Sequence, residues 1–119
     1  MSRSQIMMVL LALLLTLAAC GERLKTEDAA LIAAARTGHH GTVRDMIASG
    51  ANANVRDEHG NTALIEAARN GHDDVVRTLL AAGVDIKAKN NDGQTALMLA
   101  VRGGHDETAQ LLRQAGAVE

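Results

Sequence analysis

The chain has 119 residues, with 12 Lys and Arg against 14 Asp and Glu and a formal net charge of −2 at pH 7. It contains no Phe, Tyr, Trp or Pro, and 47% of its residues are hydrophobic. This length allows one small domain. The balanced charge excludes the basic surface that phosphate backbones require, and the lack of aromatic rings excludes base stacking, so no nucleic-acid partner is expected.

The first predicted element is an apolar run over residues 6–19, in which only Thr16 is polar. Arg3 and the amino terminus precede the run, and charged residues follow it closely, which is the arrangement of an export signal. The run is short for a membrane span, because crossing a bilayer takes about 20 apolar residues. We therefore assign residues 1–19 to a signal peptide. The alternatives are a buried core helix and an uncleaved anchor.

The end of this run, Leu17-Ala18-Ala19-Cys20, resembles the lipobox of bacterial lipoproteins. The resemblance implies that Cys20 carries a lipid and becomes the first mature residue, which explains a single Cys that cannot form an internal disulfide. Residues 20–26 are then a lipidated amino terminus and a short linker. Gly21 stands where enteric-type bacteria use Asp to retain a lipoprotein at the inner membrane. The resemblance therefore implies a lipid-anchored protein of the bacterial cell envelope, in the outer membrane and facing the periplasm.

From residue 27 onward the sequence repeats with a period of 33 residues. In the second copy, Thr62 is placed to cap a short helix that ends before Gly71, and a second helix with an apolar stripe ends at Gly83. Polar loops with Gly60 or Gly93 near their tips separate the copies. The period is clearest at three sets of equivalent positions: Gly38, Gly71 and Gly104; His39, His72 and His105; and Arg36, Arg69 and Arg102.

The segment DEHGNTALIEAARNGHDDVVRTLLAAG, residues 57–83, resembles one ankyrin repeat. Two further copies give repeats over about residues 27–56, 57–89 and 90–119, the first without its opening turn. The resemblance implies an all-α solenoid of three helix-turn-helix repeats over residues 27–119. The family's Thr-Pro-Leu-His motif is replaced here by Thr-Ala-Leu-Ile and Thr-Ala-Leu-Met. Gln110, Arg113 and Gln114 in the last helix are typical of a terminal cap, so we expect a complete, minimal solenoid.

Catalytic and metal-binding chemistry is not predicted. The three equivalent histidines are spaced by the architecture, about 8–10 Å apart, and cannot share a zinc ion. Ser49 is the one serine after the export signal, and it directly precedes a helix-ending glycine. Paired acids such as Asp73-Asp74 suit helix starts, where the helix dipole favours negative charge. We expect no catalytic residue, no metal, no cofactor and no small-molecule substrate.

The equivalent arginines Arg36, Arg69 and Arg102 fall on the first helix of each repeat, toward the side that forms the concave groove in ankyrin proteins. They predict a stripe of guanidinium groups that binds an acidic partner, and the alternative is structural pairing with loop acids such as Glu58 or Asp92. Other groove and loop positions vary between copies, and the resemblance implies that such positions choose the partner. The residues expected to bind a partner are Arg36, Thr37, Arg56, Glu58, His59, Asn61, Arg69, Asn70, Lys89, Asn91, Asp92, Gln94 and Arg102.

The sequence therefore predicts a non-enzymatic protein-protein interaction module. Its partner is expected to be another protein of the cell envelope, and its contact with the membrane is expected to run through the lipid on Cys20. The alternative is an inhibitor or immunity-type protein for a periplasmic enzyme or toxin, or an accessory protein for a periplasmic enzyme.

Overall fold

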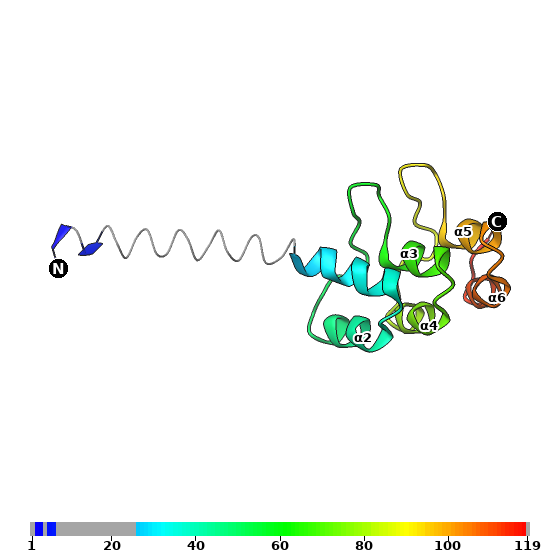
Figure 1. Ribbon diagram of the computed structural model, residues 1–119, viewed down its shortest axis with the longest axis horizontal. Helices are drawn as coiled ribbons and strands as arrows, with labels where there is room; N and C mark the ends of the chain where they lie inside the picture. Colours follow the sequence, from blue (N-terminus) through cyan, green and yellow to red (C-terminus); the bar gives the residue numbers. More distant parts are fainter. Residues whose placement is uncertain (1, 4, 7–25, 119) are drawn as a thin grey trace.

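The computed structural model describes residues 2–3, 5–6 and 26–118 (Figure 1). Most of the predicted signal peptide, Cys20 and residues 21–25 of the predicted linker lie outside the described residues. A helix over residues 26–37 pairs with α2 (His40–Ala48), α3 (Ala63–Arg69) pairs with α4 (Asp73–Ala81), and α5 (Ala96–Arg102) pairs with α6 (Asp106–Gln114). Within the described part of the chain, no helix is both long and apolar enough to cross a membrane.

The helices form two layers (Figure 1). The first helices of the pairs lie side by side, with α3 packed against α5, and the second helices form the other layer, with α4 between α2 and α6. The core between the layers repeats as the sequence does: Leu31, Leu64 and Leu97 are equivalent positions and are all at most 2% exposed. The predicted all-α solenoid with a 33-residue period is confirmed.

The start of each internal first helix is capped by a threonine, as predicted. The Oγ1 atom of Thr62 accepts a hydrogen bond from the backbone N–H of Ile65 at 3.2 Å, and Oγ1 of Thr95 accepts from that of Met98 at 3.3 Å. Each bond satisfies one of the donors that a helix start leaves free. The capped helices bury Ala63 and Ala96 completely, so the alanine that follows each threonine fits the close packing between repeats.

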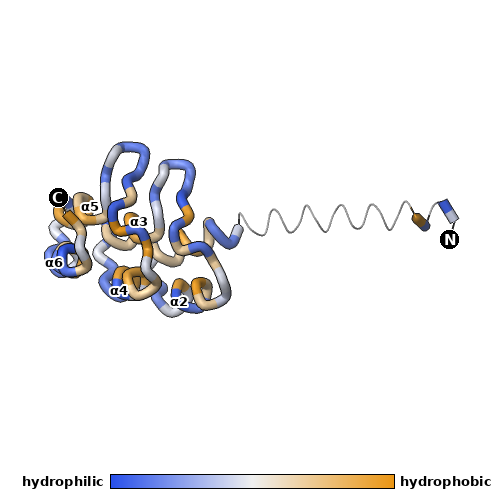
Figure 2. Tube along the Cα trace, turned by 180° about the vertical axis from the view of Figure 1, so that it is seen from behind, coloured by the Kyte–Doolittle hydropathy of each residue, from blue (hydrophilic) through white to orange (hydrophobic). Residues whose placement is uncertain are grey.

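Hairpin-like loops join the pairs and project from the layer of first helices (Figure 1). In the first loop, Asp57 N–H donates to the carbonyl of Asn61 at 3.0 Å, and Arg56 and Thr62 form an isolated antiparallel bridge. In the second loop, Asn90 N–H donates to the carbonyl of Gln94 at 3.0 Å. The loop tips are hydrophilic, whereas apolar segments concentrate in the helices (Figure 2).

In the last repeat, only one of the two helices has a polar outer side. Gln110, Arg113 and Gln114 on α6 are exposed, as expected of a cap. On α5, however, Met98 and Val101 are 39% and 48% exposed. The polar cap is therefore confined to the layer of second helices.

Candidate partner-binding surface

The predicted stripe of arginines lies on the layer of first helices, near the carboxyl ends of those helices. Arg69 and Arg102 are the last residues of α3 and α5, and Arg36 is the next-to-last residue of the helix over residues 26–37. Together with the two loops, these helix ends form what we call the first-helix surface. The sequence placed the three arginines correctly on equivalent positions of neighbouring helices.

Two of these arginines are paired with a buried glutamate. Nε of Arg36 lies 3.2 Å from Oε2 of Glu66, and Nη1 of Arg69 lies 3.2 Å from Oε1 of the same carboxylate. The Glu66 side chain is only 3% exposed, while those of Arg36 and Arg69 are 52% and 40% exposed. A buried carboxylate is costly unless it is paired and hydrogen-bonded, and here each oxygen has its own guanidinium. The cluster ties the first repeat to the second.

The pairing changes what the stripe offers to a partner. The structural alternative holds for Arg36 and Arg69, but the acid is Glu66 on α3 rather than Glu58 or Asp92 on the loops. Two positive charges and one negative charge leave the cluster with a net charge of +1. Among the described residues, Arg102 makes no ion pair or side-chain hydrogen bond, because Leu99 occupies the position equivalent to Glu66. The free cation of the stripe is thus at its carboxyl-terminal end.

Sequence reasoning missed Glu66. It lies in the middle of an unbroken buried stretch, residues 61–68, and its equivalents in the other repeats are Ala33 and Leu99. One charged residue in an otherwise apolar set of equivalent positions is the feature that marks it. Its carboxylate has hydrogen-bond partners in both neighbouring arginines, so its burial is satisfied.

Thr37 and Asn70 use their side chains locally. The Thr37 hydroxyl donates to the carbonyl of Ala33 at 2.9 Å and lies 2.6 Å from Nδ1 of His39. Nδ2 of Asn70 donates to the carbonyl of Glu66 at 2.8 Å, which satisfies a carbonyl at the end of α3. Both side chains are exposed, but their polar atoms stabilise helix ends.

The side chain of Asn61 does not lie on the surface. Asn61 is 5% exposed, and its Oδ1 accepts from Nδ2 of Asn90 at 3.0 Å. Nδ2 of Asn90 also donates to Oε1 of Gln94 at 3.0 Å. These amides join the two loops side by side, so Asn61 and the amide of Gln94 support the loops instead of presenting polar atoms to a partner.

Two further predicted residues also link the loops. Nη1 of Arg56 donates to the carbonyl of Lys89 at 2.6 Å, and Nδ2 of Asn91 donates to the carbonyl of Glu58 at 3.1 Å. The backbone N–H of Asn91 donates to the carbonyl of His59 at 3.0 Å. The loops therefore form one connected ridge, and its spacing is set by contacts between equivalent loop positions.

The side chains that remain available on the ridge are three charged residues and one histidine. The side chains of Glu58 and His59 are 86% and 74% exposed, and Nε2 of His59 lies 3.6 Å from Oε1 of Glu58. Lys89 and Asp92 are exposed, and within the described residues their side chains have no bonded partner. These four residues and Arg102 form the accessible polar part of the first-helix surface.

Two of the three equivalent histidines, His72 and His105, form hydrogen bonds to the preceding repeat. Nε2 of His72 donates to the carbonyl of Arg36 at 2.9 Å, and Nε2 of His105 donates to the carbonyl of Arg69 at 3.0 Å. Each ring closes the end of the first helix in the preceding repeat, and it lies so close to Gly38 or Gly71 that a Cβ there would be 2.9 or 2.5 Å from Nδ1. No group of three potential metal ligands occurs in the described part of the chain.

Comparison with known proteins matches this architecture. A family model described as ankyrin repeats, in three copies, matches residues 7–90 and residues 31–118. A search of curated proteins gave no match. Ankyrin-repeat proteins are generally non-enzymatic and bind other proteins through such stacked helix pairs and loops. The chain therefore belongs to the ankyrin-repeat family and carries a protein-protein interaction module.

Proposed function

We propose that this protein is a lipoprotein of the bacterial cell envelope that holds its ankyrin repeats at the outer membrane, where they bind another envelope protein. The observation that carries the proposal is the order of segments in the sequence. An apolar run ends in Leu17-Ala18-Ala19-Cys20, and the sequence repeats begin a few residues later, at about residue 27. A lipid anchor joined to a binding module by so short a linker recruits its partner to the membrane surface.

The accessible residues of the first-helix surface favour a partner whose binding surface carries both positive and negative groups. Arg102 and Lys89 are exposed cations, and Glu58 and Asp92 are exposed acids. Charges of this kind set specificity and association rate more than affinity. The paired cluster of Arg36, Glu66 and Arg69 borders this set and holds the helices beneath it in place.

The anchor is tested by fractionating cells that express the full chain or the variant Cys20→Ala. The parent is expected in the membrane fraction, and the variant is expected to lose membrane association. Gly21→Asp serves as a matched sorting variant, which should stay membrane-bound but move from the outer to the inner membrane. An unchanged distribution of Cys20→Ala would rule out the lipid anchor.

The binding surface is tested by crosslinking the tagged full chain in its native envelope and identifying attached proteins by mass spectrometry. One dominant envelope protein is expected, and its attachment should be lost when Arg102→Glu is combined with Asp92→Lys. The control is Gln110→Glu, an exposed position on α6 in the other layer, which should leave attachment unchanged. Loss with the control as well, or retention with the double variant, would refute the assignment of this surface. Recovery of a toxin or lytic enzyme would identify the role as inhibition.

A further inference from the structure

The two ends of the helix stack differ in chemistry. We call the exposed side of the helix over residues 26–37 and of α2 the N-terminal face. The exposed side of α5 and α6, with the segment through Val118, is the C-terminal face. Between them, each pair of helices is covered by the next one. In the part of the chain that the structure describes, each face is therefore one half of a repeat-repeat contact without its other half.

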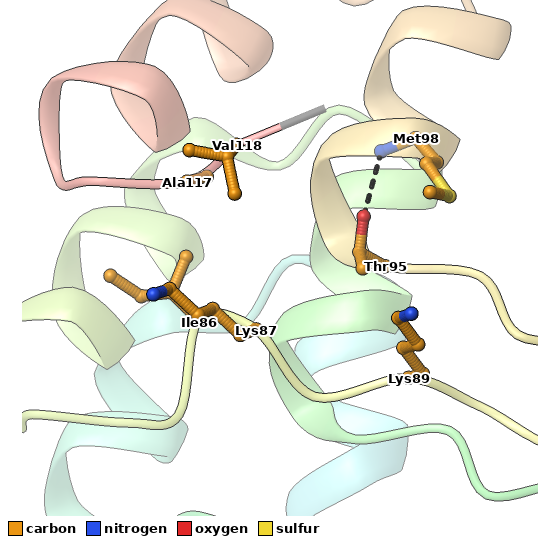
Figure 3. A pocket seen from close by; sticks show the side chains of 7 residues that line it. All are labelled: Ile86, Lys87, Lys89, Thr95, Met98, Ala117 and Val118. Carbon is orange, nitrogen blue, oxygen red and sulfur yellow. Dashed lines mark hydrogen bonds between the residues drawn. The ribbon is translucent and has the colours of Figure 1, made fainter.

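The C-terminal face is apolar with a basic rim. Met98 and Val101 are 39% and 48% exposed, whereas the equivalent Ile65 and Ala68, which the next repeat covers, are 1% and 0% exposed. Beside them is a hollow of about 270 Å³, whose apolar lining includes Ile86, Met98 and Val118 (Figure 3). The charged residues that line it are Lys87 and Lys89, both on the loop that leads into α5.

The N-terminal face is acidic. It holds a hollow of about 680 Å³, and the charged residues that line it are Glu27, Asp28 and Asp45. Arg44 lies next to Asp45, with 3.7 Å between Nε and Oδ1, so the excess of negative charge rests mainly on Glu27 and Asp28. Ala30 is exposed on this face, although the equivalent Ala63 and Ala96 are completely buried between repeats.

The two faces are complementary in both position and charge. Met98 is equivalent to Ile65, and Ala30 is equivalent to Ala96. If a following copy continues the 33-residue period, its Ala30 has the same position relative to Met98 that Ala96 has relative to Ile65. Lys87 and Lys89 lie on a loop that leads into a first helix. Glu27 and Asp28 are equivalent to the loop residues Gly60 and Asn61, so both pairs of charges lie toward the loop side of the stack. We propose that copies of this chain associate head to tail, with the C-terminal face of one against the N-terminal face of the next.

Such a contact joins two different surfaces, so it leaves one face of each kind free. It therefore produces open chains of copies that grow with concentration, not closed dimers. Because opposite charges meet at the contact, association weakens as salt is added. Charge reversal and cysteine crosslinking distinguish this contact from two alternatives, in which the C-terminal face binds a different protein or a second C-terminal face.

Charge reversal tests the proposal with the full chain in detergent, by sedimentation velocity over a range of concentrations. The parent is expected to shift to larger sizes as concentration rises. The double variant K87E/K89E carries two acidic faces, and E27K/D28K carries two basic faces, so each alone should stay at the monomer size. An equimolar mixture of the two should regain the parent's shift. Far-UV circular dichroism of each variant shows whether the helices are intact.

Cysteine crosslinking gives a second measurement that tolerates weak association. Oxidation of the full chain with both Ala30→Cys and Met98→Cys should give a ladder of dimers, trimers and longer chains. Each single variant should give no more crosslink than the parent, which controls for Cys20. A parent that sediments as one species at every concentration and a double variant without a ladder would overturn the proposal. So would dimers from Met98→Cys alone, which would place two C-terminal faces together.

Discussion

Removing the two arginines that neutralise Glu66 is expected to destabilise the fold more than removing Glu66 itself. The double variant R36M/R69M keeps most of the aliphatic part of each side chain. It leaves the Glu66 carboxylate, whose side chain is 3% exposed, without a cation. Leaving a buried charge unpaired costs about 3–5 kcal/mol. Because the arginine side chains are 52% and 40% exposed, solvent screening puts the expected cost near the lower bound, about 3 kcal/mol.

Removing the acid has a different consequence. Glu66→Leu leaves two arginines whose side chains already reach water, and it introduces the residue found at the equivalent Leu99. Its stability is expected to lie within about 1 kcal/mol of the parent, because exchanging a buried ion for an apolar side chain of similar volume is often neutral. The triple variant R36M/E66L/R69M should therefore recover most of the stability that the double variant loses.

Urea unfolding followed by far-UV circular dichroism measures these differences. With a slope of about 1–3 kcal/mol per molar urea, the double variant should lower the midpoint by about 1 M or more. Arg102→Met is the matched control, because Arg102 has no ion pair with any described residue, and it should change stability by less than about 0.5 kcal/mol. The reasoning is refuted if the double variant is as stable as this control, or if the triple variant is no more stable than the double.

Four further substitutions probe turns, a helix cap and a contact between the loops. Gly71→Ala places a Cβ 2.5 Å from Nδ1 of His105 at a φ of +69° and should lower the free energy of unfolding by about 2–3 kcal/mol. Gly104→Ala, at a φ of +72° with open space around the Cβ, should lower it by about 1 kcal/mol. Thermal unfolding compares the two variants. Thr62→Ala removes an N-cap and should cost about 1 kcal/mol in urea unfolding. Asn90→Ala removes the buried amide between the loops, should cost about 1–3 kcal/mol, and should speed amide hydrogen exchange at the loop tips.

Each of these expectations has an outcome that contradicts it. Equal losses in the two glycine variants would mean that the histidine ring shifts freely. An unchanged midpoint for the threonine variant would mean that water replaces the cap at no cost. Unchanged exchange at the loop tips would mean that backbone bonds alone, such as that between Asn91 N–H and the carbonyl of His59, hold the loops together.

The period of 33 residues predicted the fold because it is a property of the sequence that the structure reproduces in space. Each repeat packs against its neighbours in the same way, so equivalent positions such as Leu31 and Leu64 share one environment. The same logic located the threonine caps, the structural histidines and the stripe of arginines. The period predicts a structural role where two or three copies share the same residue.

The period does not predict the contacts of a residue that differs from its equivalents in the other copies. Glu66 has apolar equivalents, and a period cannot show that a single acid draws in the arginines of two repeats. Asn61 varies between copies as a contact residue would, yet Asn90 of the next loop covers it. Which loop residues face solvent depends on how closely the loops stack, and that spacing is set by contacts between chain segments about one repeat apart.

The histidine that closes each preceding helix gives the array a direction. His72 holds the carbonyl of Arg36, and His105 holds that of Arg69, so every such bond is supplied by the repeat on the carboxyl-terminal side. Within the described residues no later histidine reaches the carbonyl of Arg102. We therefore expect unfolding to begin in the last described repeat, because loss of His105 removes the hydrogen bond at the end of α3 in the repeat before it. The array is then expected to open toward its amino-terminal repeat, and a partner that contacts Arg102 is expected to stabilise the repeat that opens first.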